Sequence, residues 1–253
     1  MARIICITNQ KGGVGKTTTT VNLASCLAAI EKKTLLVDMD PQGNSTSGVG
    51  LNKNECDPNI YQVLMREAGI LEAIRPTELK KLFCVTSNSN LTGAEVELVS
   101  LEERETRLKK ALAEVEADFD YILIDCPPSL GFLTLNALTA AHSVLIPVQS
   151  EYYALEGLSS LMETVDRVRE SFNPKLEIEG ALLTMYDSRT RLSTQVSEEV
   201  RKFFGEKVYN TVIPRNVQLS ESPSFGKPII LYDIRSSGAQ AYLNLTKEIV
   251  THG

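Results

Sequence analysis

Short apolar runs alternate along the chain with longer stretches in which apolar residues return every three or four positions. The runs are rich in Ile, Leu and Val and are typical of buried strands, whereas the longer stretches are typical of helices with one apolar face. The runs predict strands over Arg3–Thr8, Thr34–Asp38, Leu82–Thr86, Tyr121–Asp125, Ser143–Pro147, Glu179–Thr184 and Val208–Ile213.

The helical stretches lie between these runs. An apolar face follows Val21–Ala28, and another, with a highly charged opposite side, follows Leu98–Val115. Helices are also predicted over Tyr153–Ser171 and over Ser193–Phe204, where Ser193 is a suitable N-cap, while Gly43–Asn59 is the least regular part. Strands separated by helices indicate βαβ units, so we expect an α/β fold with a mostly parallel, doubly wound β-sheet flanked by helices.

The first predicted strand leads into a glycine-rich loop. Lys11–Thr18 reads Lys-Gly-Gly-Val-Gly-Lys-Thr-Thr, and a helical pattern follows. Strand, loop and helix in this order are the context of a phosphate-binding loop, whose glycines bring backbone N–H groups against phosphate oxygens. The helix N-terminus attracts the same anion, Lys16 can reach the β- and γ-phosphates of a nucleotide, and the Thr17 hydroxyl can bind Mg²⁺.

The loop departs from the common Gly-x-x-x-x-Gly-Lys-Thr pattern, which would place its first glycine at position 10. This chain has Gln10 there and carries a second lysine, Lys11, next to Gly12. That lysine adds positive charge within reach of the phosphates. The alternative is an ordinary glycine-rich loop with two solvated lysines, and two motifs downstream argue against it.

Two further predicted strands end in an aspartate. Tyr121–Asp125 is followed by Cys-Pro-Pro, and Thr34–Asp38 runs into Met-Asp-Pro-Gln-Gly-Asn at positions 39–44. Ligands of open parallel sheets bind at the C-terminal ends of the strands. Asp125 is therefore placed to hold Mg²⁺, and Asp40 to orient or deprotonate an attacking water. Each aspartate could instead be a turn residue before proline, and agreement with the loop favours the functional interpretation.

Together these motifs resemble the deviant Walker A ATPases, and among them the ParA/Soj chromosome and plasmid partition proteins. The resemblance covers nearly the whole chain and includes Thr184–Thr190, Ile213–Val217 and Glu221–Ile229. The glycine-rich loop is specific to the superfamily, whereas the last two stretches point to ParA/Soj. The resemblance implies a P-loop NTPase fold, with a single deviant Walker A ATPase domain over residues 1–253.

The resemblance also implies an activity and a set of partners. ATP hydrolysis to ADP and phosphate would be slow and would be accelerated by a ParB-type centromere-binding protein. ATP, bound with Mg²⁺, would be sandwiched between the two subunits of a homodimer. The dimer would bind double-stranded DNA without sequence preference, would not bind membranes, and would be cytoplasmic and associated with the nucleoid.

The motifs and the resemblance together assign site residues. Lys11, Lys16 and Asp40 are the predicted catalytic residues, and the resemblance implies that Lys11 reaches across the dimer to the ATP of the other subunit. Thr17 and Asp125 hold Mg²⁺. The predicted ATP-binding residues are Lys11, Gly12, Gly13, Val14, Gly15, Lys16, Thr17, Thr18, Met185, Pro214 and Asn216, of which the last three border the adenine.

Charge is distributed unevenly along the 253 residues, whose net charge is −6. Residues 186–235 hold 8 basic and 6 acidic residues, while the rest of the chain holds 18 basic and 26 acidic ones. This bias permits DNA binding, and the resemblance implies it, through basic residues of the region. Such a patch acts on phosphates and makes binding sensitive to salt. The candidates are Arg189, Arg191, Arg215 and Lys227.

Composition excludes several classes of protein. With 43% hydrophobic residues the chain is long enough for one large core, and no stretch approaches the ~20 apolar residues of a membrane span. The chain begins directly with a strand, so no signal peptide is expected. Its cysteines show no metal-ligand spacing, which argues against a cluster-binding relative and favours a reducing compartment. They are Cys6, Cys26, Cys56, Cys84 and Cys126.

Two alternatives stay open. One is a MinD-like regulator recruited to membranes, whose relatives carry a basic amphipathic C-terminal tail. Here Gly238–Gly253 offers only Lys247 against Glu248, so we expect a helix packed on the sheet. The other is a metabolic ligase of the same superfamily, for which we find no set of residues suited to a carboxylate or amine substrate.

Overall fold

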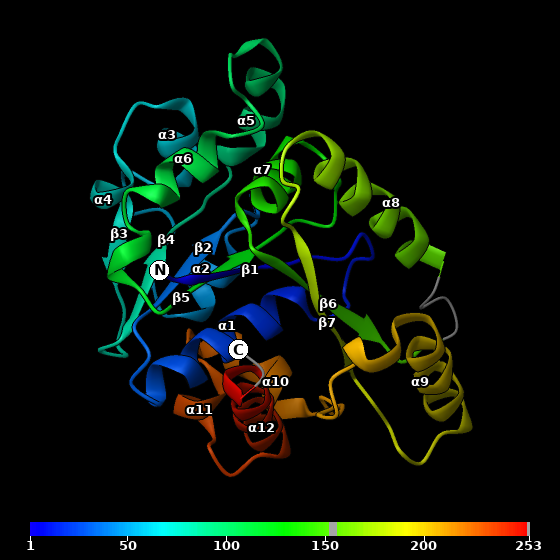
Figure 1. Ribbon diagram of the computed structural model, residues 1–253. Helices are drawn as coiled ribbons and strands as arrows, with labels where there is room; N and C mark the ends of the chain where they lie inside the picture. The colour runs from blue at the N-terminus through cyan, green and yellow to red at the C-terminus, as the bar shows by residue number, and fades with distance from the viewer. Residues whose placement is uncertain (152–155, 252–253) are drawn as a thin grey trace.

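The computed structural model describes residues 1–151 and 156–251, and a seven-stranded sheet runs through its centre (Figure 1). The strands are β1 Arg3–Ile7, β2 Thr34–Asp38, β3 Ile74–Pro76, β4 Leu82–Val85, β5 Tyr121–Asp125, β6 Ser143–Gln149 and β7 Glu177–Thr184. Their order in the sheet is β3-β4-β2-β5-β1-β6-β7, and every neighbouring pair is parallel except β3 with β4. The predicted mostly parallel α/β sheet is confirmed.

Helices cover both faces of this sheet. The α-helices are α1 Lys16–Ala29, α2 Asn44–Gly48, α3 Ile60–Met65, α4 Ile70–Ala73, α5 Leu91–Glu97, α6 Arg107–Ala113, α7 Phe132–Ala140, α8 Glu156–Ser171, α9 Arg191–Phe204, α10 Val217–Glu221, α11 Ile229–Tyr232 and α12 Ser237–Thr251. Short 3₁₀ helices are η1 Leu98–Ser100, η2 Glu116–Asp118, η3 Gly205–Lys207 and η4 Ser222–Phe225. Helices α1 and α12 cover one face, and α6, α7 and α8 cover the other (Figure 1).

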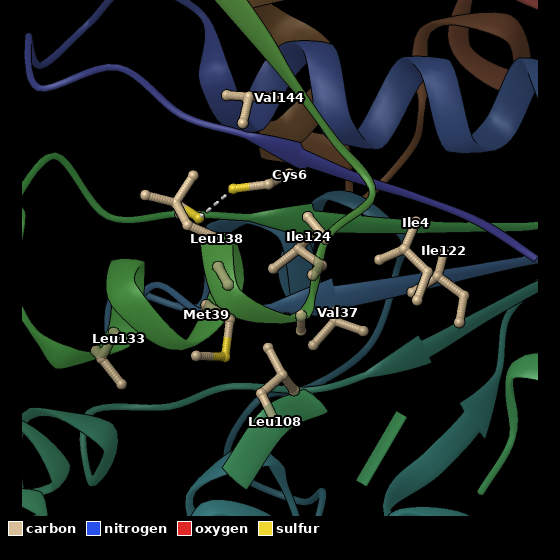
Figure 2. Packing of buried hydrophobic residues seen from close by; sticks show 14 of the residues in the cluster. Ile4, Cys6, Val37, Met39, Leu108, Ile122, Ile124, Leu133, Leu138 and Val144 are labelled. Atoms are coloured by element: carbon tan, nitrogen blue, oxygen red, sulfur yellow. Dashed lines mark hydrogen bonds between the residues drawn. The ribbon is translucent and has the colours of Figure 1, made fainter. Parts of the chain in front are cut away.

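Each central strand contributes to two cores, because successive side chains of a strand point to opposite faces. In β1, Ile4 and Cys6 pack on the side of α6 and α7, whereas Ile5 and Ile7 pack on the side of α1 and α12. Figure 2 shows the first of these cores, where the Cys6 and Cys126 sulfur atoms lie 3.3 Å apart as free thiols. Burial on both faces explains why the strands are continuous apolar runs in the sequence.

The predicted strand Val208–Ile213 is wrong. Here the chain is held to β7 by an isolated bridge between Val208 and Ala181 and by the Ile213 amide, which donates to the Leu183 carbonyl oxygen at 2.8 Å. A second isolated bridge joins Pro214 to Tyr186. Between the bridges, the amides of residues 210 and 211 donate to the Glu248 carboxylate at 2.7 and 3.0 Å instead of to β7. Val208, Tyr209 and Ile213 are therefore buried, although the segment does not form a strand.

The predicted helix Leu98–Val115 is also wrong as a continuous element. The 3₁₀ helix η1 ends at Ser100, and α6 begins only at Arg107. Between them Glu103 has φ +55°, in the left-handed region, which a continuing helix does not allow. The Arg107 guanidinium donates to the carbonyl oxygen of Glu102 and holds this break in place.

Other boundaries shift by a few residues. Helix α9 begins two residues before the predicted Ser193, because the Thr190 side chain is the N-cap and accepts from the Ser193 amide. The short edge strand β3 was not predicted, and α2 lies in the segment expected to be least regular. Helix α8 confirms the predicted helix up to Ser171, whereas the predicted beginning at Tyr153 lies outside the described residues.

Candidate functional site

The glycine-rich loop joins β1 to α1. From β1 the chain continues to β2 on one side of the sheet, whereas from β5 it continues to β6 on the other side of β1. Gly13 and Gly15 have φ values of +74° and +88°, a conformation that side chains with a Cβ rarely adopt. Thr184, at the end of β7, donates from its hydroxyl to the Val14 carbonyl oxygen at 2.8 Å and fixes the loop from the side. The structure thus gives the loop the form that a phosphate cradle requires.

Lys16 is a buried cation at the start of α1. Its Nζ donates to the Lys11 carbonyl oxygen at 3.0 Å, and it is 7% exposed. Burial lowers the pKa of Lys16, while the nearby Asp125 and Asp40 carboxylates oppose this shift. An anion bound in the loop would compensate the cost of burying this charge.

Asp125 ends β5 beside Asp38, which ends β2, and the two residues pair in register. Both are fully buried. Asp125 accepts hydrogen bonds from the Ser45 hydroxyl at 2.7 Å and the Thr20 hydroxyl at 3.2 Å. Burial raises the pKa of Asp125, and the Ser45, Thr17 and Thr20 hydroxyls oppose the rise.

These surroundings suit a hard cation. Mg²⁺ prefers oxygen ligands and is commonly held by one or two carboxylates together with substrate phosphates. Thr17 and Asp125 supply a hydroxyl and a carboxylate of that kind, and a cation there would offset the burial of Asp125. Within the described ranges no group of three or more His, Cys, Asp or Glu residues forms an all-protein metal site.

Asp38 organises the loop that follows β2. Its Oδ2 accepts from both the amide and the hydroxyl of Thr46 at 2.8 Å, and its Oδ1 accepts from the Asp40 amide at 3.1 Å. Burial raises the pKa of Asp38, the neighbouring Asp125 raises it further, and the Thr46 hydrogen bonds oppose the rise. Asp38 therefore fixes the conformation of this loop through its hydrogen bonds.

A cavity of about 540 Å³ brings most of the predicted phosphate and catalytic residues together. Its walls come from the glycine-rich loop, the loop after β2, and the segments after β4, β5 and β7. They are Gly12, Gly13, Gly15, Lys16, Thr17, Thr18, Asp40, Pro41, Gln42, Asn44, Thr92, Pro128 and Met185. Asp40, in the loop after β2, and Lys16, at the start of α1, thus line the same cavity.

A second cavity of about 280 Å³ adjoins the first, and both are lined by Gly15, Thr18 and Met185. It also contains Pro214 and Asn216, so the three residues predicted to border adenine do lie together. Met185 has φ +50°, which is uncommon for a residue other than glycine and marks a constrained turn. The adenine contact itself stays a prediction.

The predicted DNA-binding residues are less closely grouped. The Arg189 side chain is 87% exposed and forms an ion pair with Asp187 at 2.8 Å, and the Arg215 side chain is 65% exposed and forms one with Glu151 at 3.2 Å. Arg191 and Lys227 are exposed at the start of α9 and just after η4. Lys227 lines a third cavity of about 370 Å³ with Thr17 and Thr18, which places it near the phosphate loop.

Hydroxyl groups are the functional residues that the sequence analysis missed. Ser45 and Thr20 hold Asp125, Thr46 holds Asp38, and Thr184 holds the glycine-rich loop. Serine and threonine are common in loops, and none of these has a diagnostic spacing to its partner. Only the folded arrangement shows their roles.

The C-terminal helix α12 packs with α1 over one face of the sheet, as predicted. The Tyr242 hydroxyl is 3.1 Å from Thr19 Oγ1 in α1, and the Arg3 guanidinium at the start of β1 donates to the Ile249 carbonyl oxygen at 3.0 Å. Tyr242, Leu245 and Ile249 are buried, so the apolar face of the helix is covered. Throughout the described part of the chain, no helix has the length and apolar character needed to cross a bilayer.

Comparison with known proteins gives a consistent result. The family described as "AAA domain" matches residues 2–178. The chain is 59% identical over 253 residues, which is 100% of both chains, to the sporulation initiation inhibitor protein Soj of Bacillus subtilis. It is 58% identical over 250 residues, or 99% of this chain and 88% of the relative, to the chromosome partitioning protein ParA of Myxococcus xanthus.

A solved structure is similar over the whole chain. It is cobyrinic acid a,c-diamide synthase from Mycobacterium smegmatis with bound ADP and magnesium, with a TM-score of 0.88 and 37% identity. The alignment covers 100% of this chain and 95% of the other. That neighbour holds its ADP and magnesium within the same fold.

Proposed function

Since this chain belongs to the ParA/Soj family of chromosome-partitioning ATPases, we propose that it is an ATP-dependent dimerising switch that moves DNA. In this proposal ATP joins two subunits, the dimer binds DNA without sequence preference, and a ParB-type partner stimulates hydrolysis. The replicon is a chromosome or a plasmid, and the protein acts on the nucleoid. The identity over the full chain supports partitioning, and the site geometry supports the chemistry.

The phosphates of ATP bind in the 540 Å³ cavity. The backbone N–H groups around Gly13 and Gly15 and at the N-terminus of α1 donate hydrogen bonds to the phosphate oxygens, and Lys16 turns from the Lys11 carbonyl oxygen to the β- and γ-phosphates. Thr17 and Asp125 would hold Mg²⁺, which would neutralise negative charge on the phosphates.

Asp40 acts on the attacking water. It lines the same cavity as Lys16, and its Oδ1 accepts from the Gln42 amide at 2.9 Å, which orients the carboxylate within its loop. A positioned general base contributes about 10²–10⁴ to a rate. Lys11 stands beside the exposed Gly12 and reaches the ATP of the other subunit, so a complete site needs a dimer.

The proposed DNA-binding surface consists of exposed basic residues. Arg189, Arg191, Arg215 and Lys227 are exposed and act on phosphates of the DNA backbone. The ion pairs of Arg189 and Arg215 are solvent-exposed and therefore weak, so either arginine can exchange its carboxylate for a phosphate. Dimerisation would present these basic residues twice and make binding depend on ATP.

The observation that carries this proposal is the convergence of Lys16, Thr17 and Asp40 on one cavity in a chain 59% identical to Soj. A pelleting assay tests it, with DNA or with liposomes, each in ATP or in ADP. We expect the protein to pellet with DNA in ATP only. Pelleting with liposomes in ATP would favour a MinD-like regulator instead.

A metabolic ligase is the second candidate function, because the similar solved structure is described as a diamide synthase. The exposed rim of the 540 Å³ cavity would then receive a carboxylate substrate. In that case the protein would pellet with neither DNA nor liposomes, and ATP hydrolysis would require an added acid and amine donor.

A further inference from the structure

A hydroxyl from a neighbouring strand holds the peptide of Asp40. Ser87 lies two residues beyond the end of β4 and is fully buried. Its Oγ donates to the Asp40 carbonyl oxygen at 2.7 Å, and the same oxygen accepts from the Gly43 amide at 2.9 Å. The sheet and the loop's own turn therefore fix this carbonyl group from two directions.

The same serine is tied to the far end of the loop. Its backbone amide donates to Thr46 Oγ1 at 3.0 Å, and that hydroxyl donates to Asp38 Oδ2 at 2.8 Å. Asp38 Oδ1 accepts from the Asp40 amide at 3.1 Å, so the hydrogen bonds lead from Asp40 through Ser87 and Thr46 back to Asp40. The loop is thus fixed where it leaves β2, at Asp40 and where it enters α2.

Close backbone packing supports the same conclusion. A Cβ at Gly43, which has φ +62°, would lie 2.7 Å from the Ser87 carbonyl oxygen. The loop and the segment after β4 therefore meet backbone to backbone, with no room for a side chain between them. A small displacement of Ser87 would be passed directly to the loop.

We infer that Ser87 is a positioning residue for ATP hydrolysis, acting through the main chain of Asp40. This inference rests on the function proposed above for Asp40. The Gln42 amide that holds the Asp40 carboxylate belongs to the same loop and moves with it, whereas Ser87 is anchored at the end of β4. Loss of the Ser87 hydroxyl frees the peptide to rotate and displaces the carboxylate from the water.

Ser87→Ala tests the inference, with Thr86→Val as a matched control. Thr86 is equally buried and adjacent, and its Oγ1 has no hydrogen-bond partner in the described structure. For Ser87→Ala we expect kcat to fall about ten- to a hundredfold with KM for ATP unchanged, because a displaced base costs turnover rather than binding. Ser87→Cys, which has the same side-chain shape with a larger atom that donates only weakly, should be intermediate, and Thr86→Val should retain its turnover.

A second experiment separates positioning from a structural role. The hydrogen bond from Ser87 goes to the main chain, so it persists in Asp40→Ala. If Ser87 positions the carboxylate, adding Ser87→Ala to Asp40→Ala lowers the residual single-turnover rate no further. An equal loss of rate in both backgrounds, or a rise in KM with unchanged kcat, overturns the inference.

The outcomes also distinguish this inference from the proposed function. If Asp40→Ala hydrolyses ATP normally, the role of Asp40 is wrong. If Asp40→Ala is inactive but Ser87→Ala turns over like the parent protein, only the positioning role of Ser87 fails.

Discussion

Removal of the Ser45 hydroxyl tests the electrostatics at the centre of the site. Ser45 and Asp125 are both fully buried, and the Ser45 hydroxyl donates to Asp125 Oδ2 at 2.7 Å. Ser45→Ala leaves the carboxylate with one donor fewer, away from bulk water. Because a hydrogen bond to a charged group contributes roughly 1.5–3 kcal/mol, we expect the free energy of unfolding to fall by about that amount at pH 8.

The size of this loss should depend on pH. Burial raises the pKa of Asp125 to about 6, and the Ser45 hydrogen bond opposes the rise. The pKa of an unfolded aspartate is about 4, so the folded protein holds the Asp125 proton more tightly. This contribution to the free energy of unfolding is fully present at low pH and is lost as the pH rises through the folded pKa. Ser45→Ala raises the folded pKa further. Its full cost therefore appears at pH 8, whereas at pH 5 the carboxyl is mostly protonated and only a neutral hydrogen bond of about 0.5–1.5 kcal/mol is lost.

Urea unfolding of the nucleotide-free protein in EDTA, at pH 5 and pH 8, measures both quantities. Ser25→Ala is the matched control, because Ser25 is equally buried and donates at 2.7 Å to the uncharged carbonyl oxygen of Val21. We expect the control to lose about 0.5–1.5 kcal/mol at both pH values. The reasoning is refuted if Ser45→Ala costs the same at both pH values, or costs no more than Ser25→Ala at pH 8.

Further predictions concern the nucleotide and the DNA. Lys16→Ala removes a charged hydrogen bond of roughly 1.5–3 kcal/mol, so ATP affinity measured by calorimetry should fall about 10- to 150-fold, and unchanged affinity would contradict the phosphate-loop assignment. Asp40→Ala should still bind ATP and dimerise but release phosphate about 10²–10⁴ times more slowly, whereas loss of ATP binding would point to another role. Arg189→Ala or Lys227→Ala should weaken DNA binding about equally for all sequences and flatten its log–log salt dependence by roughly one for each DNA phosphate that the variant no longer neutralises. Unaltered binding at every salt concentration would place the DNA-binding surface elsewhere.

The sequence predicted the parts of the fold whose signal is local. Strands β2 and β5 have the predicted bounds, because each is an apolar run buried on both faces that ends in an aspartate. The glycine-rich loop is equally local, since a few neighbouring residues define its conformation. Lys16, Thr17 and Asp40 could therefore be identified from their places in short sequence motifs, and the structure brings them to one cavity.

The spacing of apolar residues predicted the wrong element where side chains are buried as expected but the backbone between them has another conformation. Leu98, Leu108, Leu112 and Val115 are all buried, as the helical spacing required, yet the backbone between them is broken at Glu103. The run from Val208 to Ile213 is similar, because part of its hydrogen bonding goes to a side chain from α12. Apolar spacing reports which side chains are buried, and it does not report which groups satisfy the backbone.

The hydroxyl contacts could not be predicted because their partners are distant in the sequence. Ser45 bonds a residue 80 positions away, Thr20 one that is 105 away, and Ser87 one that is 47 away. The sequence alone does not show that a serine or threonine hydroxyl belongs to a site, because only the fold brings its hydrogen-bond partner near. Such residues complete the site around the aspartates that the sequence does reveal.

The central claim is that ATP controls binding to DNA of any sequence, and one measurement tests it most directly. The equilibrium affinity for two unrelated duplexes is determined in ADP and in a slowly hydrolysed ATP analogue, with Lys16→Ala as the control. We predict tight binding in the analogue only, equal for the two duplexes, weakened steeply by salt and absent in Lys16→Ala. Affinity that is the same in both nucleotides, or that depends on the duplex sequence, would contradict the account.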